Sequence, residues 1–113
     1  MSVVLIDGYR TTLKGKAVAS ATTVRVPRAH AVKLNQVGVG NHMYMFLKDR
    51  IGTEVVKYYH DADWASVGSS IVDLPVQRAQ SGTGARNFPY GACLQSGVTG
   101  AYVAELVAAL NRG

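Results

Sequence analysis

The segment from Arg78 to Leu94 constrains the fold of this chain more than any other part of its sequence. Its glycines Gly82 and Gly84 permit a positive φ where the backbone must reverse, and Pro89, placed before Tyr90-Gly91, sets φ for a second tight turn. Strand-like apolar runs stand on both sides of these turns. The segment therefore predicts a compact corner that joins the end of one strand to the start of the next.

The glycine-rich run of this corner does not match a phosphate-binding loop. It lacks the Gly-Lys-Ser/Thr signature, and the residues that follow it, Arg86 to Pro89, cannot open a helix smoothly. The polar side chains of the corner instead have donors and acceptors with which to pin it internally. For Arg86 a second role stays open, in which its guanidinium pairs with an acidic group of a partner protein. The predicted structural corner consists of Arg78, Gln80, Gly82, Thr83, Phe88, Pro89 and Gly91.

A β-hairpin is predicted upstream of the corner. Its first strand, from Met43 to Leu47, has apolar side chains on both faces, which is typical of a strand at the centre of a sheet or at an interface. Asp49 to Gly52 supply the turn, and the return strand covers Thr53 to His60. A loop with the single tryptophan, Trp64, follows, and this side chain either caps the core or anchors a partner.

The remaining elements complete a small β domain. Extended segments are predicted over residues 3–6, 11–13, 17–26, 71–78 and 92–95. Pro27 is predicted as the first residue of a short helix that ends before Gly38. We therefore expect one domain over residues 1–113, mostly β with a minor α part: an antiparallel β-sandwich or barrel-like fold of five to seven strands. Residues 1–20 are a candidate N-terminal arm, with residues 3–6 either a first strand or lying on a neighbour.

A second helix is predicted at the end of the chain, over residues 99–111, with Thr99 as its cap. Its apolar residues recur at helical spacing, and Glu105 is the one charge inside it. We expect part of this helix to pack against another subunit, while docking of one face on its own sheet remains the alternative. The candidate interface residues on it are Val103, Leu106, Val107 and Leu110.

The positive charge is concentrated in the first third of the chain. The net charge is +5, and residues 1–40 hold six bases against the single acid Asp7, whereas the other six bases are matched by six acids. Three explanations stay open: contacts to nucleic acid, docking on an acidic protein surface, or hydrated bases between strands. The candidate interface residues in this region are Arg10, Lys14, Lys16, Arg25 and Arg28. With only 17% charged residues, the composition also favours buried subunit contacts.

No arrangement of residues indicates catalysis, a cofactor or a metal. The histidines, His30, His42 and His60, fall on different elements, although a three-residue hairpin loop would set His42 opposite His60. Cys93 lies in an apolar strand as a small core residue and has no general base near it in sequence. The acids Asp61, Asp63 and Asp73 are expected to be solvated. We expect a protein that is not an enzyme and binds no cofactor.

A longer pattern surrounds the corner. Glu54-Val55-Val56 is followed by Val76 to Ala85, then by Phe88-Pro89, Gly91 and the closing strand Ala92-Cys93-Leu94. Together with Gly40 to Tyr44 upstream, this pattern resembles tail-fibre and fibre-attachment domains of tailed bacteriophages over roughly residues 20 to 95. Ala79 stands where these domains usually have glycine, so the first bend of the loop is expected to differ.

The resemblance implies a non-enzymatic virion protein that contacts neighbouring subunits in the tail, baseplate or fibre base. Its partners would be other virion proteins and further copies of itself, with a trimer favoured, and nucleic acid is not an expected partner. Two alternatives stay open, a head decoration (cement) protein that clamps capsomers and a glycan-binding module. The glycan-binding alternative would use an aromatic platform made of Tyr58, Tyr59, Trp64 and Tyr90.

The sequence also bears on location. The first residues lack the basic start and long apolar core of a signal peptide, and no run approaches the roughly 18 apolar residues of a membrane span. With a single cysteine, no internal disulfide is possible within the chain. We expect assembly in the cytoplasm of a host bacterium, incorporation into a virion, and no contact with a membrane.

Overall fold

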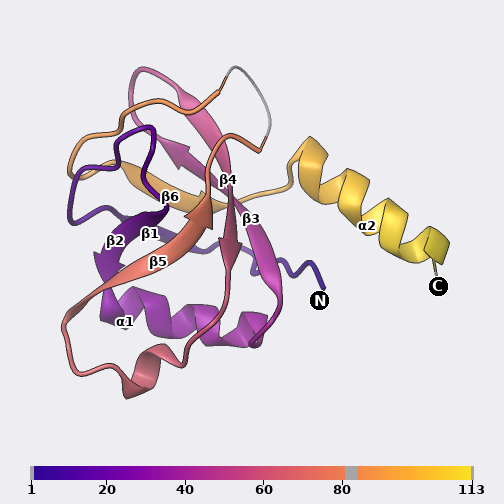
Figure 1. Ribbon diagram of the computed structural model, residues 1–113, viewed down its shortest axis with the longest axis horizontal. Helices are drawn as coiled ribbons and strands as arrows, with labels where there is room; N and C mark the ends of the chain where they lie inside the picture. Colours follow the sequence, from indigo (N-terminus) through magenta and orange to yellow (C-terminus); the bar gives the residue numbers. More distant parts are fainter. Residues whose placement is uncertain (1, 81–83, 113) are drawn as a thin grey trace.

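The structure is a computed structural model that describes residues 2–80 and 84–112. It confirms the predicted class: six antiparallel strands form one curled sheet in the order β1-β6-β3-β4-β5-β2, with three short helical segments and a C-terminal helix (Figure 1). The strands are β1 (Arg10–Thr12), β2 (Thr23–Pro27), β3 (His42–Lys48), β4 (Thr53–Tyr59), β5 (Ile71–Gln77) and β6 (Cys93–Ser96). The helical segments are α1 (Arg28–Ala31), η1 (Val32–Val37), η2 (Trp64–Ser66) and α2 (Gly100–Arg112).

The predicted hairpin is confirmed as β3 and β4. His42 pairs with Tyr59 and Lys48 with Thr53, so residues 49–52 form a four-residue loop. This register sets Asn41, and not His42, opposite His60, because the backbone groups of Asn41 and His60 are hydrogen-bonded. β3 lies between β4 and β6, and both of its faces are covered. Met43, Met45 and Leu47 are in the core, while Tyr44 on the other face is 6% exposed and contacts Glu105 of the C-terminal helix.

The sheet curls until its two edge strands come close to each other. The amide of Lys14, just after β1, donates to the carbonyl of Arg25 in β2 at 2.7 Å. The inner face of this curled sheet holds the core, and the predicted alternation in β2 is confirmed, with Val24 and Val26 buried and Arg25 exposed. α1 and η1 cover one end of the core through Ala31, Leu34 and Val37.

Two details differ from the expectation. The N-terminal residues lie on the protein's own sheet and not as an arm on a neighbour, because Val4 and Ser2 are hydrogen-bonded to His42 at the start of β3, and Tyr9 and Leu13 are core residues. The parallel bridge between Val3 and His42 agrees with the alternative of a strand at residues 3–6, although it is a single bridge. Pro27 is the N-cap of α1 with an extended ψ of 137°, and not its first helical residue, because its backbone also ends strand β2. The N-terminal segment is thus part of the domain.

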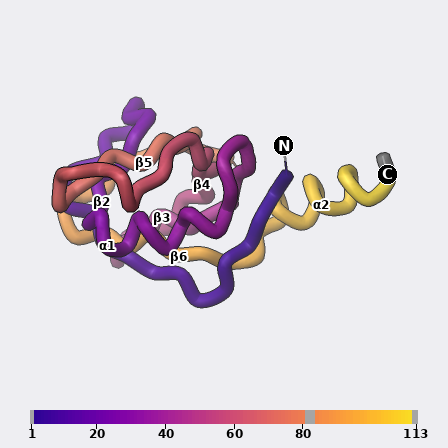
Figure 2. Tube along the Cα trace, turned by 90° about the horizontal axis from the view of Figure 1, so that it is seen from below, coloured from indigo at the N-terminus to yellow at the C-terminus, as the bar shows by residue number. Residues whose placement is uncertain are grey.

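Helix α2 projects from the body of the molecule. Figures 1 and 2 show it leaving the end of β6 and extending past the sheet, so that only its first turns approach β3. Among the residues described, no helix has the length and apolar character needed to cross a membrane.

Candidate functional site

The corner is built around the carboxylate of Glu54, on β4, which is 1% exposed. This group accepts four hydrogen bonds: two from the guanidinium of Arg78, at 2.7 and 3.0 Å, and one each from the amides of Ala79 and Arg86, both at 2.9 Å. The Arg78 guanidinium also donates to the carbonyls of Val18 and Arg86, each at 2.6 Å. One ion pair therefore ties β4 to three separate loop segments.

The charge state of Glu54 follows from these contacts. Burial by itself would raise its pKa, but the hydrogen bonds from Arg78, Arg86 and Ala79 lower the pKa below its usual value. Sequence reasoning placed Arg78 at the corner but missed Glu54. The sequence did contain an indication of its role, because Glu54 alternates onto the same strand face as Val56 and Tyr58. A carboxylate on a buried face requires a charged or hydrogen-bonding partner.

The turns of the corner use the backbone conformations that its composition predicts, at the positions the structure describes. Gly84 has a φ of 109° and Gly91 a φ of 87°, and the amide of Ala92 closes the second turn onto the carbonyl of Pro89 at 3.2 Å. The backbone amide of Gln80 donates to the carbonyl of Val55, and its side-chain amide donates to the carbonyl of Arg78 at 3.1 Å. Gly82 and Thr83 lie outside the described residues.

Ala79 adopts a left-handed conformation, with a φ of 57°, where glycine would be unstrained. We expect Ala79→Gly to raise the free energy of unfolding by about 0.5–1 kcal/mol, because relief of strain outweighs the added entropy of the unfolded chain. Urea unfolding would measure this change. Ala85→Gly is the matched control, since Ala85 is exposed without a positive φ and its replacement should lower stability slightly. A loss of stability in Ala79→Gly would contradict the expectation.

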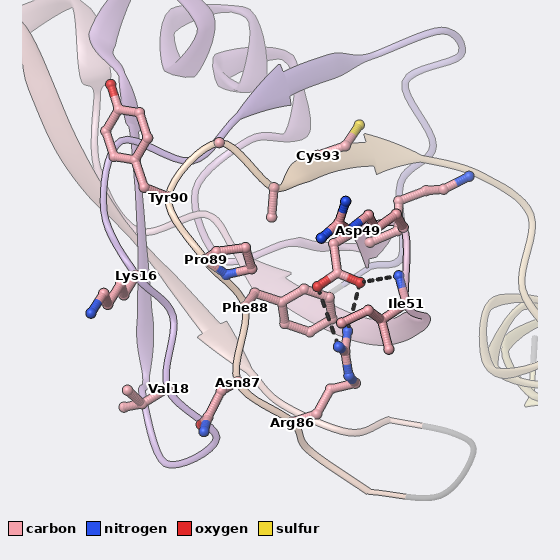
Figure 3. Close-up of a pocket in the computed structure, with 14 residues that line it drawn as sticks. Lys16, Val18, Asp49, Ile51, Arg86, Asn87, Phe88, Pro89, Tyr90 and Cys93 are labelled. Atoms are coloured by element: carbon pink, nitrogen blue, oxygen red, sulfur yellow. Dashed lines mark hydrogen bonds and ion pairs between the residues drawn. The ribbon is translucent and has the colours of Figure 1, made fainter.

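Arg86 pairs within its own chain. Its guanidinium contacts Asp49 in the β3–β4 turn at 3.0 and 3.2 Å and stacks on the ring of Phe88, 4.4 Å from the ring centre (Figure 3). Asp49 also accepts from the amides of Ile51 and Gly52, and the hydrogen bond from Arg86 contributes most to a pKa below the usual value for this carboxyl. The alternative in which Arg86 pairs with a partner's acid is therefore not what the structure shows.

A cleft of about 900 Å³ opens beside this corner (Figure 3). Its walls come from the β3–β4 turn, from the segment ahead of β6, and from the loop between β1 and β2. The sequence had pointed to the two ends of the chain for binding surfaces, and not to the corner. The apolar lining residues are Val18, Ile51, Phe88, Pro89, Tyr90 and Ala92.

Two residues of the cleft are placed differently from what the sequence predicted or left open. Cys93 lines the cleft and is half-buried, because the alternation of β6 turns Leu94 and not Cys93 into the core. Its thiol donates to the side-chain oxygen of Gln95 at 3.4 Å. Lys16, from the basic N-terminal third, stands at the same cleft with Lys48 and Arg50, so this surface is positively charged.

The other predicted basic residues are spread over different contacts. Arg25 pairs with Asp73 at 3.1 Å, and Lys14 lies 5.9 Å from the centre of the Tyr90 ring. Arg10 is exposed on edge strand β1, and Arg28 is half-buried at the start of α1. The five candidate basic residues therefore do not form one surface, and Lys16 is the one among them that lines the cleft.

Helix α2 exposes the apolar residues that the sequence singled out. The hydroxyl of Thr99 caps the helix by accepting from the amide of Tyr102 at 2.9 Å, as predicted. Beyond its first turns the helix extends past the sheet, and its four candidate interface side chains are open to solvent. The exposed fractions are 45% for Val103, 38% for Leu106, 49% for Val107 and 72% for Leu110.

A polar cluster attaches α2 to the sheet. The hydroxyl of Tyr44 donates to Glu105 at 2.5 Å, and the ammonium of Lys57 lies 3.6 Å from the same carboxylate. The imidazole of His42, 4% exposed, lies 2.7 Å from Glu105, which is ion-pair distance without hydrogen-bond alignment. Burial opposes ionisation of Glu105, but Tyr44, His42 and Lys57 together keep its pKa below the usual value. The helix is thus held by one charged residue.

The buried histidines make stability depend on pH. Burial lowers the pKa of both His42 and His60, although nearby carboxylates oppose the shift, so the unfolded chain binds protons more readily as the pH falls below about 6.5. We therefore expect the urea midpoint to fall between about pH 7.5 and 5.5, and to fall further below about pH 4.5 as Glu54 and Glu105 are protonated. His42→Asn should show a smaller fall over the first interval. Higher stability at pH 5.5 than at pH 7.5 would refute this assignment.

The remaining sequence candidates have structural roles. His30 is hydrogen-bonded to Thr11 at 2.6 Å, and His60 to Tyr58 at the same distance. Within residues 2–80 and 84–112, no group of three or more histidine, cysteine or acidic residues could hold a metal ion. Asp63 caps η2, and Asp73 pairs with Arg25.

The aromatic platform proposed for a glycan-binding module is not assembled. Tyr58 is fully buried, and Trp64 is a core residue whose indole donates to the Tyr58 hydroxyl at 2.9 Å. Neither ring is therefore free to stack on a sugar. Tyr59 is half-buried and held by Gln77, whereas Tyr90 is exposed at the cleft.

No known protein-family model matches the chain, and no curated protein has a similar sequence. Two open surfaces, the cleft and α2, are the candidate functional surfaces of this protein.

Proposed function

We propose that this protein is a non-enzymatic structural subunit whose helix α2 joins it to neighbouring subunits. The observation that carries the proposal is the exposure of four large apolar side chains on one helix, Val103, Leu106, Val107 and Leu110. Each Å² of apolar surface that remains in water is less favourable, by about 25 cal/mol of free energy, than the same surface buried in a contact. Burial against a second subunit would recover that free energy.

The way in which α2 is attached supports the same role. Glu105 and its three partners lie on the side of α2 that faces β3 and β4, so the helix is held in place while its apolar residues stay open. A helix presented in this manner is typical of recognition in which apolar anchors three and four residues apart enter a groove of the partner. The rigid corner keeps the sheet that carries α2 in shape.

The sequence pattern over residues 20–95 supports placing this subunit in a phage particle, in the tail, baseplate or fibre-attachment region. Its partners would then be further copies of the chain and other virion proteins. Electron microscopy of labelled virions would test the location, and label on the head would favour the decoration protein instead.

The assembly role predicts a clear effect of charge on α2. We expect Leu106→Asp and Leu110→Asp to weaken self-association by about tenfold or more, because each buries a carboxylate in an apolar contact. Sedimentation velocity of the purified protein would measure this. Val39→Asp is the matched control, since Val39 is 73% exposed but belongs neither to α2 nor to the lining of the cleft. Self-association unchanged in both helix variants would refute a role for α2.

A further inference from the structure

The exposed apolar surface of this protein is concentrated in two places. Of the ten large hydrophobic side chains that are exposed in the described part of the chain, four lie on α2 and three line the cleft. The three at the cleft are Val18, Ile51 and Tyr90. Apolar residues gathered in this way mark contact surfaces, whereas single exposed ones are common on any protein.

The chemistry of the cleft restricts what it can accept. Ile51, Pro89 and Tyr90 supply exposed apolar surface. Three cations, Lys16, Lys48 and Arg50, surround this apolar surface. The one acid among the lining residues, Asp49, is already paired with Arg86. An occupant should therefore be apolar and carry no positive charge on the face that enters.

The segment of this chain that meets both conditions is α2. Residues 100–111 include no lysine or arginine, and the only carboxylate among them is Glu105. Arg112, the last residue of α2, comes seven positions after Glu105, so its position is on the helix face of Glu105 and not on that of the apolar residues. We propose that α2 of one copy of this protein binds in the cleft of a second copy, an inference that rests on the assembly role proposed above.

Insertion into the helix's own cleft is opposed by the connectivity. The cleft lies at the first residue of β6, Cys93, while α2 leaves from the last, Ser96, and extends away from the corner (Figure 1). Glu105 also holds α2 against β3 and β4. The acceptor must therefore be another molecule.

A contact between helix and cleft uses two different surfaces of the same chain, so it is heterologous. Such contacts repeat from copy to copy and close into a ring, or continue as a filament where the rotation does not close. Pairing of two α2 helices would instead be isologous and would leave the apolar residues of the cleft uncovered. The helix-to-cleft arrangement covers both surfaces.

The test uses one helix variant, Leu110→Asp, one cleft variant, Ile51→Asp, and the control Val39→Asp. All three side chains are more than 70% exposed, so the substitutions should leave the fold intact, which circular dichroism would verify. Sedimentation velocity at about 100 μM would detect association with a Kd of about 1 μM or below. We expect wild type and Val39→Asp to form the same oligomer, and each of the other variants alone to associate about tenfold or more weakly.

A mixture of Leu110→Asp and Ile51→Asp distinguishes the helix-to-cleft contact from pairing of two α2 helices. The helix variant keeps its cleft and the cleft variant keeps its helix, so an equal mixture should form a one-to-one dimer and nothing larger. If Ile51→Asp assembles like wild type while Leu110→Asp does not, the cleft is not the acceptor and the assembly role of α2 still stands. If neither variant assembles and their mixture remains monomeric, heterologous pairing is wrong. A wild-type protein that remains monomeric overturns both proposals.

Discussion

Replacing Glu54 by alanine is expected to lower the free energy of unfolding by about 3–5 kcal/mol, because it leaves the buried guanidinium of Arg78 without its counter-charge. The amides of Ala79 and Arg86 lose their acceptor in the same step. Since small domains are stable by only about 5–15 kcal/mol, this is a large fraction of the total. Urea unfolding followed by circular dichroism would measure it.

Two further variants separate the charge of Glu54 from its shape. Glu54→Gln keeps one acceptor oxygen and should cost less than alanine. The double variant Glu54→Leu with Arg78→Met removes both charges, but we do not expect it to restore full stability, because the two amides still lack an acceptor. A loss below about 1 kcal/mol for Glu54→Ala would show that the corner does not depend on this ion pair.

The second large effect is expected at Phe88. Its residue is 2% exposed, and the guanidinium groups of Arg86 and Arg78 lie 4.4 and 5.8 Å from the centre of its ring. Phe88→Ala should lower the free energy of unfolding by about 3–5 kcal/mol, through lost apolar burial, the cavity that remains, and the lost cation–π contacts.

Phe88→Leu is the matched control for that substitution. Leucine keeps most of the apolar volume but gives up the aromatic face, so its cost should be clearly smaller. The backbone pairing of Phe88 with Ala17, at 2.8 and 2.9 Å, should survive in this variant and keep both amides protected from hydrogen exchange. Equal losses for alanine and leucine would mean that the aromatic contacts, and not the filled volume, dominate.

Much of the fold was predictable because its determinants are local. The alternation in Thr53–Tyr59, the turn residues Asp49 to Gly52, and the helical spacing from Val103 to Leu110 each depend on neighbours a few residues away. The cap at Thr99 is local in the same sense. Such patterns identify strands, turns and helices without knowledge of what packs against them.

The candidate site was less predictable because its contacts join distant segments. Glu54 and Arg78 are 24 residues apart, and Arg86 and Asp49 are 37 apart. Nothing in the spacing of these residues indicates which acid meets which base. The cleft was missed for the same reason, since Lys16, Ile51 and Tyr90 come from three segments that meet only in the folded chain.

The sequence by itself determined that this chain forms a small antiparallel β domain with a rigid corner and an apolar C-terminal helix, because periodicity and turn chemistry act over a few residues. Only the tertiary structure decided that the corner is held by Glu54 and borders a basic, apolar cleft, and that α2 stands clear of the sheet. The physical reason is that burial and charge pairing depend on which distant segments the fold brings together.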